Sequence, residues 1–100
     1  MIIYEHPLMT LGANETAPTY FIKVGAGEHR VDVVYGENVT GTVTPKHTVD
    51  PINPDSMNAV TVDGEELILT ATGSFVIFGP CLVGFIVASL AGGSIKVQSV

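Results

Sequence analysis

The chain has 100 residues, of which 46% are hydrophobic and only 14% charged, with a formal net charge of −6. This length predicts a single domain. Four Lys and Arg stand against ten Asp and Glu, which argues against binding to nucleic acid or to an anionic membrane surface, because both require clustered basic side chains.

Residues 1–18 are expected to form an extended arm. Pro7 and Pro18 restrict the backbone to extended conformations. A secretory signal is not expected, because a basic segment followed by a short apolar one is missing here. Apolar residues in such an arm are expected to add a strand to this domain or to lie against a neighbouring subunit. The residues assigned to this partner contact are Met1, Ile2, Ile3, Tyr4, Pro7 and Leu8.

Alternating apolar and polar residues predict the first strands of the domain. Residues 19–24 and 31–35 alternate in this way, and Gly25-Ala26-Gly27 between them is interpreted as a turn. Gly36-Glu37-Asn38 has the residue types of a second turn, and residues 39–44 alternate Val with Gly and Thr, as expected of a half-exposed strand.

The middle of the chain combines an irregular stretch with a clear hairpin. Residues 45–57 contain three prolines and are expected to form a long loop or an edge. Asp63-Gly64 lies between the β-rich residues 59–62 and 65–71, which predicts a two-residue turn with positive φ.

The last third of the chain carries no charge between Glu66 and Lys96. Its Val, Ile and Phe content favours three strands at residues 75–78, 82–90 and 94–100. Tight turns are expected between them, at Gly79-Pro80 and at Gly92-Gly93. The predicted fold is therefore all-β: a single antiparallel β-sandwich or small barrel over residues 19–100, preceded by the arm.

An uncharged run of this length also permits a helix that spans a membrane, because about 20 apolar residues are sufficient. The corresponding alternative is a small holin-like membrane protein that spans with residues 73–92. Against it, a proline inside a helix costs about 3 kcal/mol or more.

The polar residues suggest no catalytic, cofactor-binding or metal site. The three histidines are scattered, and adjacent Glu65 and Glu66 on a strand would point to opposite faces. A cluster of Asp and Asn residues in and just after the loop does not follow the order of calcium ligands in an EF-hand. Its members are Asp50, Asn53, Asp55 and Asn58. Cys81 alone cannot form an intrachain disulfide and is expected to be a buried thiol. We therefore expect a protein that is not an enzyme.

The order of these segments resembles small all-β virion proteins of tailed bacteriophages, and capsid decoration (cement) proteins most of all. The resemblance covers residues 19–100. Its motifs are Val31-Asp-Val-Val-Tyr35, Val39-Thr-Gly-Thr-Val-Thr44, a Pro/Asp loop and a Thr/Gly hairpin, and then Gly79-Pro80 and Leu90-Ala-Gly-Gly-Ser-Ile-Lys-Val97.

The resemblance implies a structural protein that binds the outside of an assembled phage head and stabilises it through protein–protein contacts. Such proteins are commonly homo-oligomers, often trimers, whose partners are the major capsid protein or other virion subunits. It implies synthesis in the host cytoplasm and final location in the virion, with no cofactor, nucleic acid or small-molecule substrate. A tail, baseplate or head–tail component is the structural alternative.

Overall fold

The computed structural model describes residues 2–4, 8–49 and 57–100. All regular structure among these residues is β-strand, which confirms the all-β prediction. The strands are β1 (Ile2–Tyr4), β2 (Leu8–Leu11), β3 (Tyr20–Tyr35), β4 (Thr40–Thr48), β5 (Asn58–Ala59), β6 (Thr61–Val62), β7 (Glu65–Glu66), β8 (Gly73–Ala91) and β9 (Ile95–Ser99).

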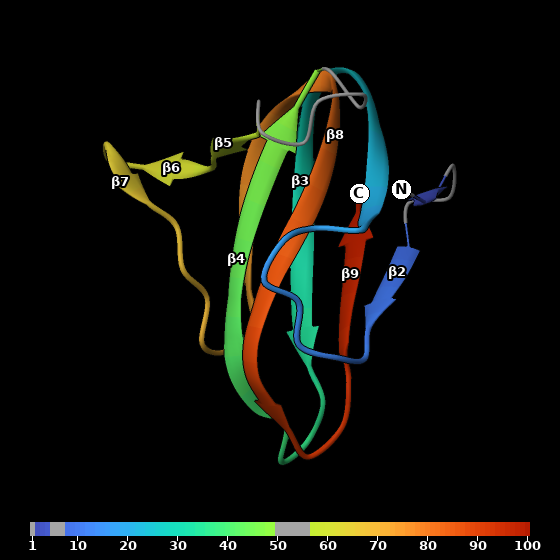
Figure 1. The fold of residues 1–100 in the computed structure, drawn as a ribbon. Helices are drawn as coiled ribbons and strands as arrows, with labels where there is room; N and C mark the ends of the chain where they lie inside the picture. Colours follow the sequence, from blue (N-terminus) through green and yellow to red (C-terminus); the bar gives the residue numbers. More distant parts are fainter. Residues whose placement is uncertain (1, 5–7, 50–56) are drawn as a thin grey trace.

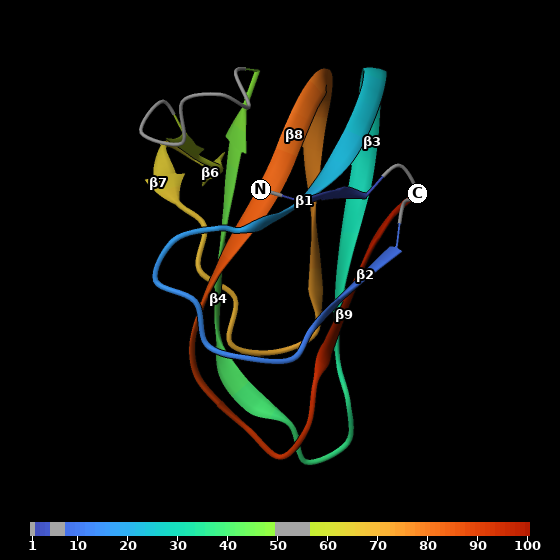
Figure 2. The same cartoon turned by 45° about the vertical axis from the view of Figure 1, so that its right-hand side comes forward.

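One sheet contains most of these strands, in the order β2-β9-β3-β8-β4-β5 (Figures 1 and 2). All neighbours along this path pair antiparallel, as expected from the sequence. β1 lies off the path and pairs parallel with the first residues of β3. β6 and β7 form a separate two-stranded hairpin that projects from the side of the sheet (Figure 1).

The two longest strands, β3 and β8, bend together near their middle. Between the pairs Val24–Cys81 and Gly27–Gly79, β3 contains one residue more than β8, which is a β-bulge. A bulge bends a strand and increases its local twist without ending it. The turns predicted at Gly25-Ala26-Gly27 and at Gly79-Pro80 are therefore wrong: each is the bend of a continuous strand, and the Gly79–Pro80 peptide is cis.

Glycine is required where these two bends meet. A Cβ atom on Gly79 would overlap the carbonyl oxygen of Gly25 and would lie 2.9 Å from the carbonyl oxygen of Val24. The backbones of β3 and β8 can approach this closely only because Gly79 has no side chain.

β4 extends further than the sequence suggested. Residues 45–48, assigned to a loop because of their proline, belong to this strand and pair with β8 and β5. Pro45 is fully buried, and its carbonyl accepts a hydrogen bond from the amide of Val60 at 3.5 Å. Pro45 thus contributes a carbonyl and a packed ring to the sheet, although it has no amide hydrogen to donate.

The Asp63-Gly64 turn is confirmed. Both residues have positive φ, 53° and 83°, and they join β6 to β7. The second strand is shorter than the predicted residues 65–71, because the chain leaves the hairpin after Glu66. Leu69 instead exchanges two backbone hydrogen bonds of 2.8 Å with Val43, and its partly buried side chain packs on the core.

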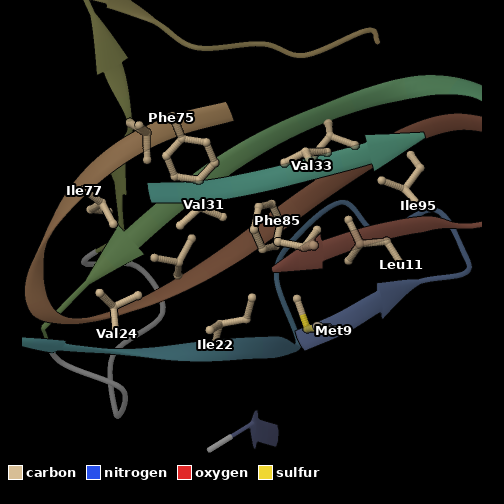
Figure 3. Packing of buried hydrophobic residues seen from close by; sticks show 14 of the residues in the cluster. Met9, Leu11, Ile22, Val24, Val31, Val33, Phe75, Ile77, Phe85 and Ile95 are labelled. Carbon is tan, nitrogen blue, oxygen red and sulfur yellow. The ribbon is translucent and has the colours of Figure 1, made fainter. Parts of the chain in front are cut away.

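The hydrophobic core lies between the two halves of the bent sheet (Figure 3). Ile22 and Val24 from the first part of β3 contact the same cluster as Val31 and Val33 from the second part. Phe85 of β8 is the largest of the fully buried side chains. The other buried members are Met9, Leu11, Val43, Val60, Phe75, Ile77, Cys81, Val83, Val87, Ile95 and Val97.

Parts of the predicted arm pair with the chain's own sheet. β1 lies beside β3, and β2 lies beside β9 as the outermost strand of the main path. The side chains of Met9 and Leu11 are buried in the core, and Glu15 exchanges backbone hydrogen bonds of 2.9 and 3.0 Å with Val87. The boundary drawn at residue 18 therefore does not separate these segments from the core.

Candidate partner-binding surface

The residues predicted for partner contact lie along the N-terminal strands. Met1 and Pro7 lie outside the described residues. Ile2, Ile3 and Tyr4 form β1, whose backbone pairs with β3. Leu8 begins β2, where its backbone pairs with Gln98 and its side chain is 52% exposed.

A more pronounced apolar surface lies on the first half of β8. Residues alternate across a strand, so Phe75 and Ile77 face the core while Val76 and Phe78 face outwards. Phe78 is 70% exposed and Val76 is 51% exposed. The sequence contained this alternation, but it did not show which face of residues 75–78 would be left uncovered.

A groove lies along this half of β8. Its volume is about 250 Å³, and it is lined by residues 76–78, residues 59–61 and His47. The walls combine the outward apolar side chains of β8 with Val60, which belongs to the core. We call this hollow the β8 groove.

Near the β8 groove, the basic side chains are paired with carboxylates, whereas one carboxylate forms no ion pair among the described residues. Arg30 is neutralised by Asp32 through two hydrogen bonds of 2.9 and 3.2 Å, and Lys46 contacts Glu66 at 2.8 Å. Glu28 lies directly opposite Phe78 in the register of β3 and β8. Within the described part of the chain, Glu28 forms no ion pair.

Only some of the other polar residues considered from the sequence lie in the described part of the chain. His6, Asp50, Asn53 and Asp55 lie outside the described residues. The ring of His29 forms a hydrogen bond of 3.1 Å with the backbone oxygen of Ala26. Among the residues that the structure describes, no three His, Cys, Asp or Glu side chains are grouped as metal ligands would be.

Cys81 is buried in the core, where the sequence placed it. Desolvation by burial raises the pKa of its thiol. A thiol in this environment reacts slowly, because the thiolate is the nucleophile.

A second hollow of about 280 Å³ lies beside β2 and is lined mainly by residues 10–13, with Glu15 and Tyr20. The carboxylate of Glu15 accepts a hydrogen bond of 2.9 Å from the hydroxyl of Thr19. Glu15 and Tyr20 are the ionisable residues in its lining.

The chain matches no protein-family model, no curated protein and no solved structure.

The membrane alternative required a helix over residues 73–92. That assignment is wrong, because Gly73–Ala91 forms strand β8. No helix of the described residues has the length and hydropathy to cross a membrane.

Proposed function

We propose that this chain is a non-enzymatic structural protein of a bacteriophage virion, which binds the outside of the capsid and stabilises it through protein–protein contacts. The observation that carries the proposal is the outward apolar surface of β8, where Phe78 and Val76 are 70% and 51% exposed. Exposed apolar surface on a domain with so little charge favours contact with another protein.

The proposal includes the finer architecture of the domain, a β-sandwich or small barrel. Its support is that the two halves of the bent strands β3 and β8 contribute to one buried cluster. Ile22 from one half and Val33 from the other are both 0% exposed. Two sheet faces that enclose a common apolar layer are the defining arrangement of a sandwich.

Several copies are expected to act together on the capsid as a homo-oligomer, which the resemblance implies is often a trimer. Repeated weak contacts on a repeating shell give a higher overall affinity than one contact, because the later binding events are intramolecular. Sedimentation velocity of the purified protein measures its oligomeric state directly.

Localisation in the particle tests the proposal. Phage particles grown with the gene are purified on a density gradient, probed with an antibody raised against this protein and then examined by gold labelling in the electron microscope. We expect the protein in the particle fraction, with label on the head. Label confined to the tail or baseplate would support the structural alternative. Protein left entirely in the unassembled fraction would refute a virion role.

A further inference from the structure

Among the residues that the structure describes, the first half of β8 has a free backbone edge. Residues 73–79 pair with β3 on one side, whereas β4 pairs with β8 only from Leu82 onwards. In the described part of the chain, no strand pairs with the other side of residues 74–78. Such an edge presents unpaired amide and carbonyl groups that can hydrogen-bond to an added strand.

The β8 groove lies beside this edge, because residues 76–78 belong to its lining. Residues 59–61 and His47 complete this lining. A volume of about 250 Å³ lies just below the roughly 300–1,000 Å³ of ligand pockets, so the groove accommodates a few side chains and not a folded element. An added strand would place alternate side chains beside Val76 and Phe78 on the outer face and beside Ile77 on the inner face.

The charges around the groove indicate which kind of strand fits. Glu28 is the cross-strand neighbour of Phe78, and Asp63 and Glu65 lie on the hairpin that continues from the groove wall. These three carboxylates form no ion pair among the described residues, whereas the nearby cations Arg30 and Lys46 are already neutralised. A basic side chain lying across the ring of Phe78 would meet Glu28 behind it.

The same charges disfavour a second copy of this chain as the occupant. A second β8 strand has no basic side chain to offer Glu28, Asp63 and Glu65, because residues 67–95 carry no charge, and each copy adds a net charge of −6. Like charges across an interface oppose association and select against that partner.

We propose that the free edge of β8 binds an extended segment of a partner protein, about five residues long, with alternating apolar residues and with Lys or Arg at its ends. This inference rests on the proposed function, since the segment would belong to a neighbouring virion subunit. Backbone hydrogen bonds supply the affinity, while the apolar side chains and the basic ends select the sequence.

A synthetic peptide, Lys-Thr-Val-Thr-Val-Thr-Lys, whose Val and Lys residues share one face of a strand, tests this inference without any particle. Titrated into the isotopically labelled protein, it is expected to shift the amide signals of residues 74–78 and to slow their hydrogen exchange. Val76→Lys should weaken binding at least about tenfold, because it removes an apolar contact and repels the basic ends. Val34→Lys is the matched control, because Val34 is 46% exposed on β3 and its backbone pairs with Lys96 of β9, away from residues 74–78.

The charge requirement has its own comparison. Glu28→Gln should weaken peptide binding by about two- to fivefold and reduce its salt dependence. Glu37→Gln, in the exposed turn after β3, should leave binding unchanged. A peptide with Glu at both ends should bind more weakly than the Lys peptide. Equal binding of the two peptides, or shifts outside residues 74–78, would overturn the proposal. Concentration-dependent dimerisation of the wild type that Val76→Lys abolishes would identify a second copy as the occupant instead.

Co-sedimentation with particles grown without the gene separates this inference from the proposed function. If both proposals hold, the wild type and Val34→Lys bind the particles while Val76→Lys is released. If the wild type and Val76→Lys bind equally well, the virion role stands and the β8 edge is not its attachment site. If the wild type fails to bind the particles, the proposed function is wrong. The peptide titration then tests by itself whether the free edge of β8 binds an extended segment.

Discussion

Replacing Gly79 by alanine should strongly destabilise the fold, because Gly79 lies where the bends of β3 and β8 touch. The added methyl group would overlap the carbonyl oxygen of Gly25 and lie 2.8 Å from its carbonyl carbon. These are backbone atoms, so no change of side-chain rotamer can relieve the overlap. Overpacking that shifts backbone costs typically about 1–3 kcal/mol and sometimes more, and we expect the upper end, about 3 kcal/mol.

For a domain of this size, 1 kcal/mol corresponds to about 4–8 °C in Tm, so Gly79→Ala should lower Tm by about 12–24 °C. Differential scanning calorimetry measures this, alongside urea unfolding followed by circular dichroism. Gly12→Ala is the matched control: Gly12 is exposed, and an added Cβ would have no atom within 4 Å. That control should melt within about 3 °C of the wild type, since a tolerated Gly→Ala change is worth at most about 1 kcal/mol.

Gly27→Ala distinguishes close packing from backbone strain at the same bend. Gly27 has a φ of 92°, yet a Cβ there would also meet no atom within 4 Å. A non-glycine residue held at such a φ costs about 1–3 kcal/mol, without any steric overlap. If Gly79→Ala melts at the wild-type temperature with a native-like amide spectrum, the backbones of β3 and β8 are not in close contact at Gly79, and the prediction is wrong.

Three further predictions concern the core. Phe85→Ala should lower the free energy of unfolding by about 3–5 kcal/mol, because Phe85 is 1% exposed; a urea midpoint near that of the wild type would contradict its place in the core. Tyr35→Phe should cost about 1–2 kcal/mol in urea unfolding, since the hydroxyl contacts the backbone oxygens of Gly41 and Leu69, both at 2.9 Å. An unchanged midpoint would show that these contacts contribute nothing. Cys81, whose thiol pKa is raised by burial, should react with an aromatic disulfide at pH 8 at least about tenfold more slowly than in the urea-unfolded chain. Equal rates in the two states would mean that Cys81 is accessible.

The sequence predicts the faces of the strands well where apolar and other residues alternate. Val31 and Val33 face the core, as do Ile95 and Val97, because a period of two assigns alternate residues to one face. The Asp63-Gly64 turn was predictable for an equally local reason, because its positive φ values suit these residue types.

The bends could not be predicted from local sequence. Gly25-Ala26-Gly27 and Gly79-Pro80 each have the composition of a turn, and only their position opposite each other in the sheet shows that they are one shared bend. The extension of β4 through Pro45 likewise depends on pairing with β5 and β8. Such pairings join residues far apart in the chain, and no short window of sequence contains both partners.

The candidate surface was missed for a similar reason. The uncharged sequence of residues 75–78 does not show which face is covered, and the structure leaves Val76 and Phe78 exposed. Which face is covered depends on where β4 stops pairing with β8, and that position is a property of the whole sheet.

The order of strands in the sheet also determines when the chain can fold during synthesis. β2 depends on β9 for its pairing, β3 on β8 and β9, and β4 on β8, so the sheet lacks its central partner until residues 73–99 have been made. Non-local pairing of this kind slows folding and leaves apolar strands exposed on the nascent chain. A ribosome-bound chain that ends before β8 should therefore be unfolded, and folding should follow only after the last strand has left the ribosome.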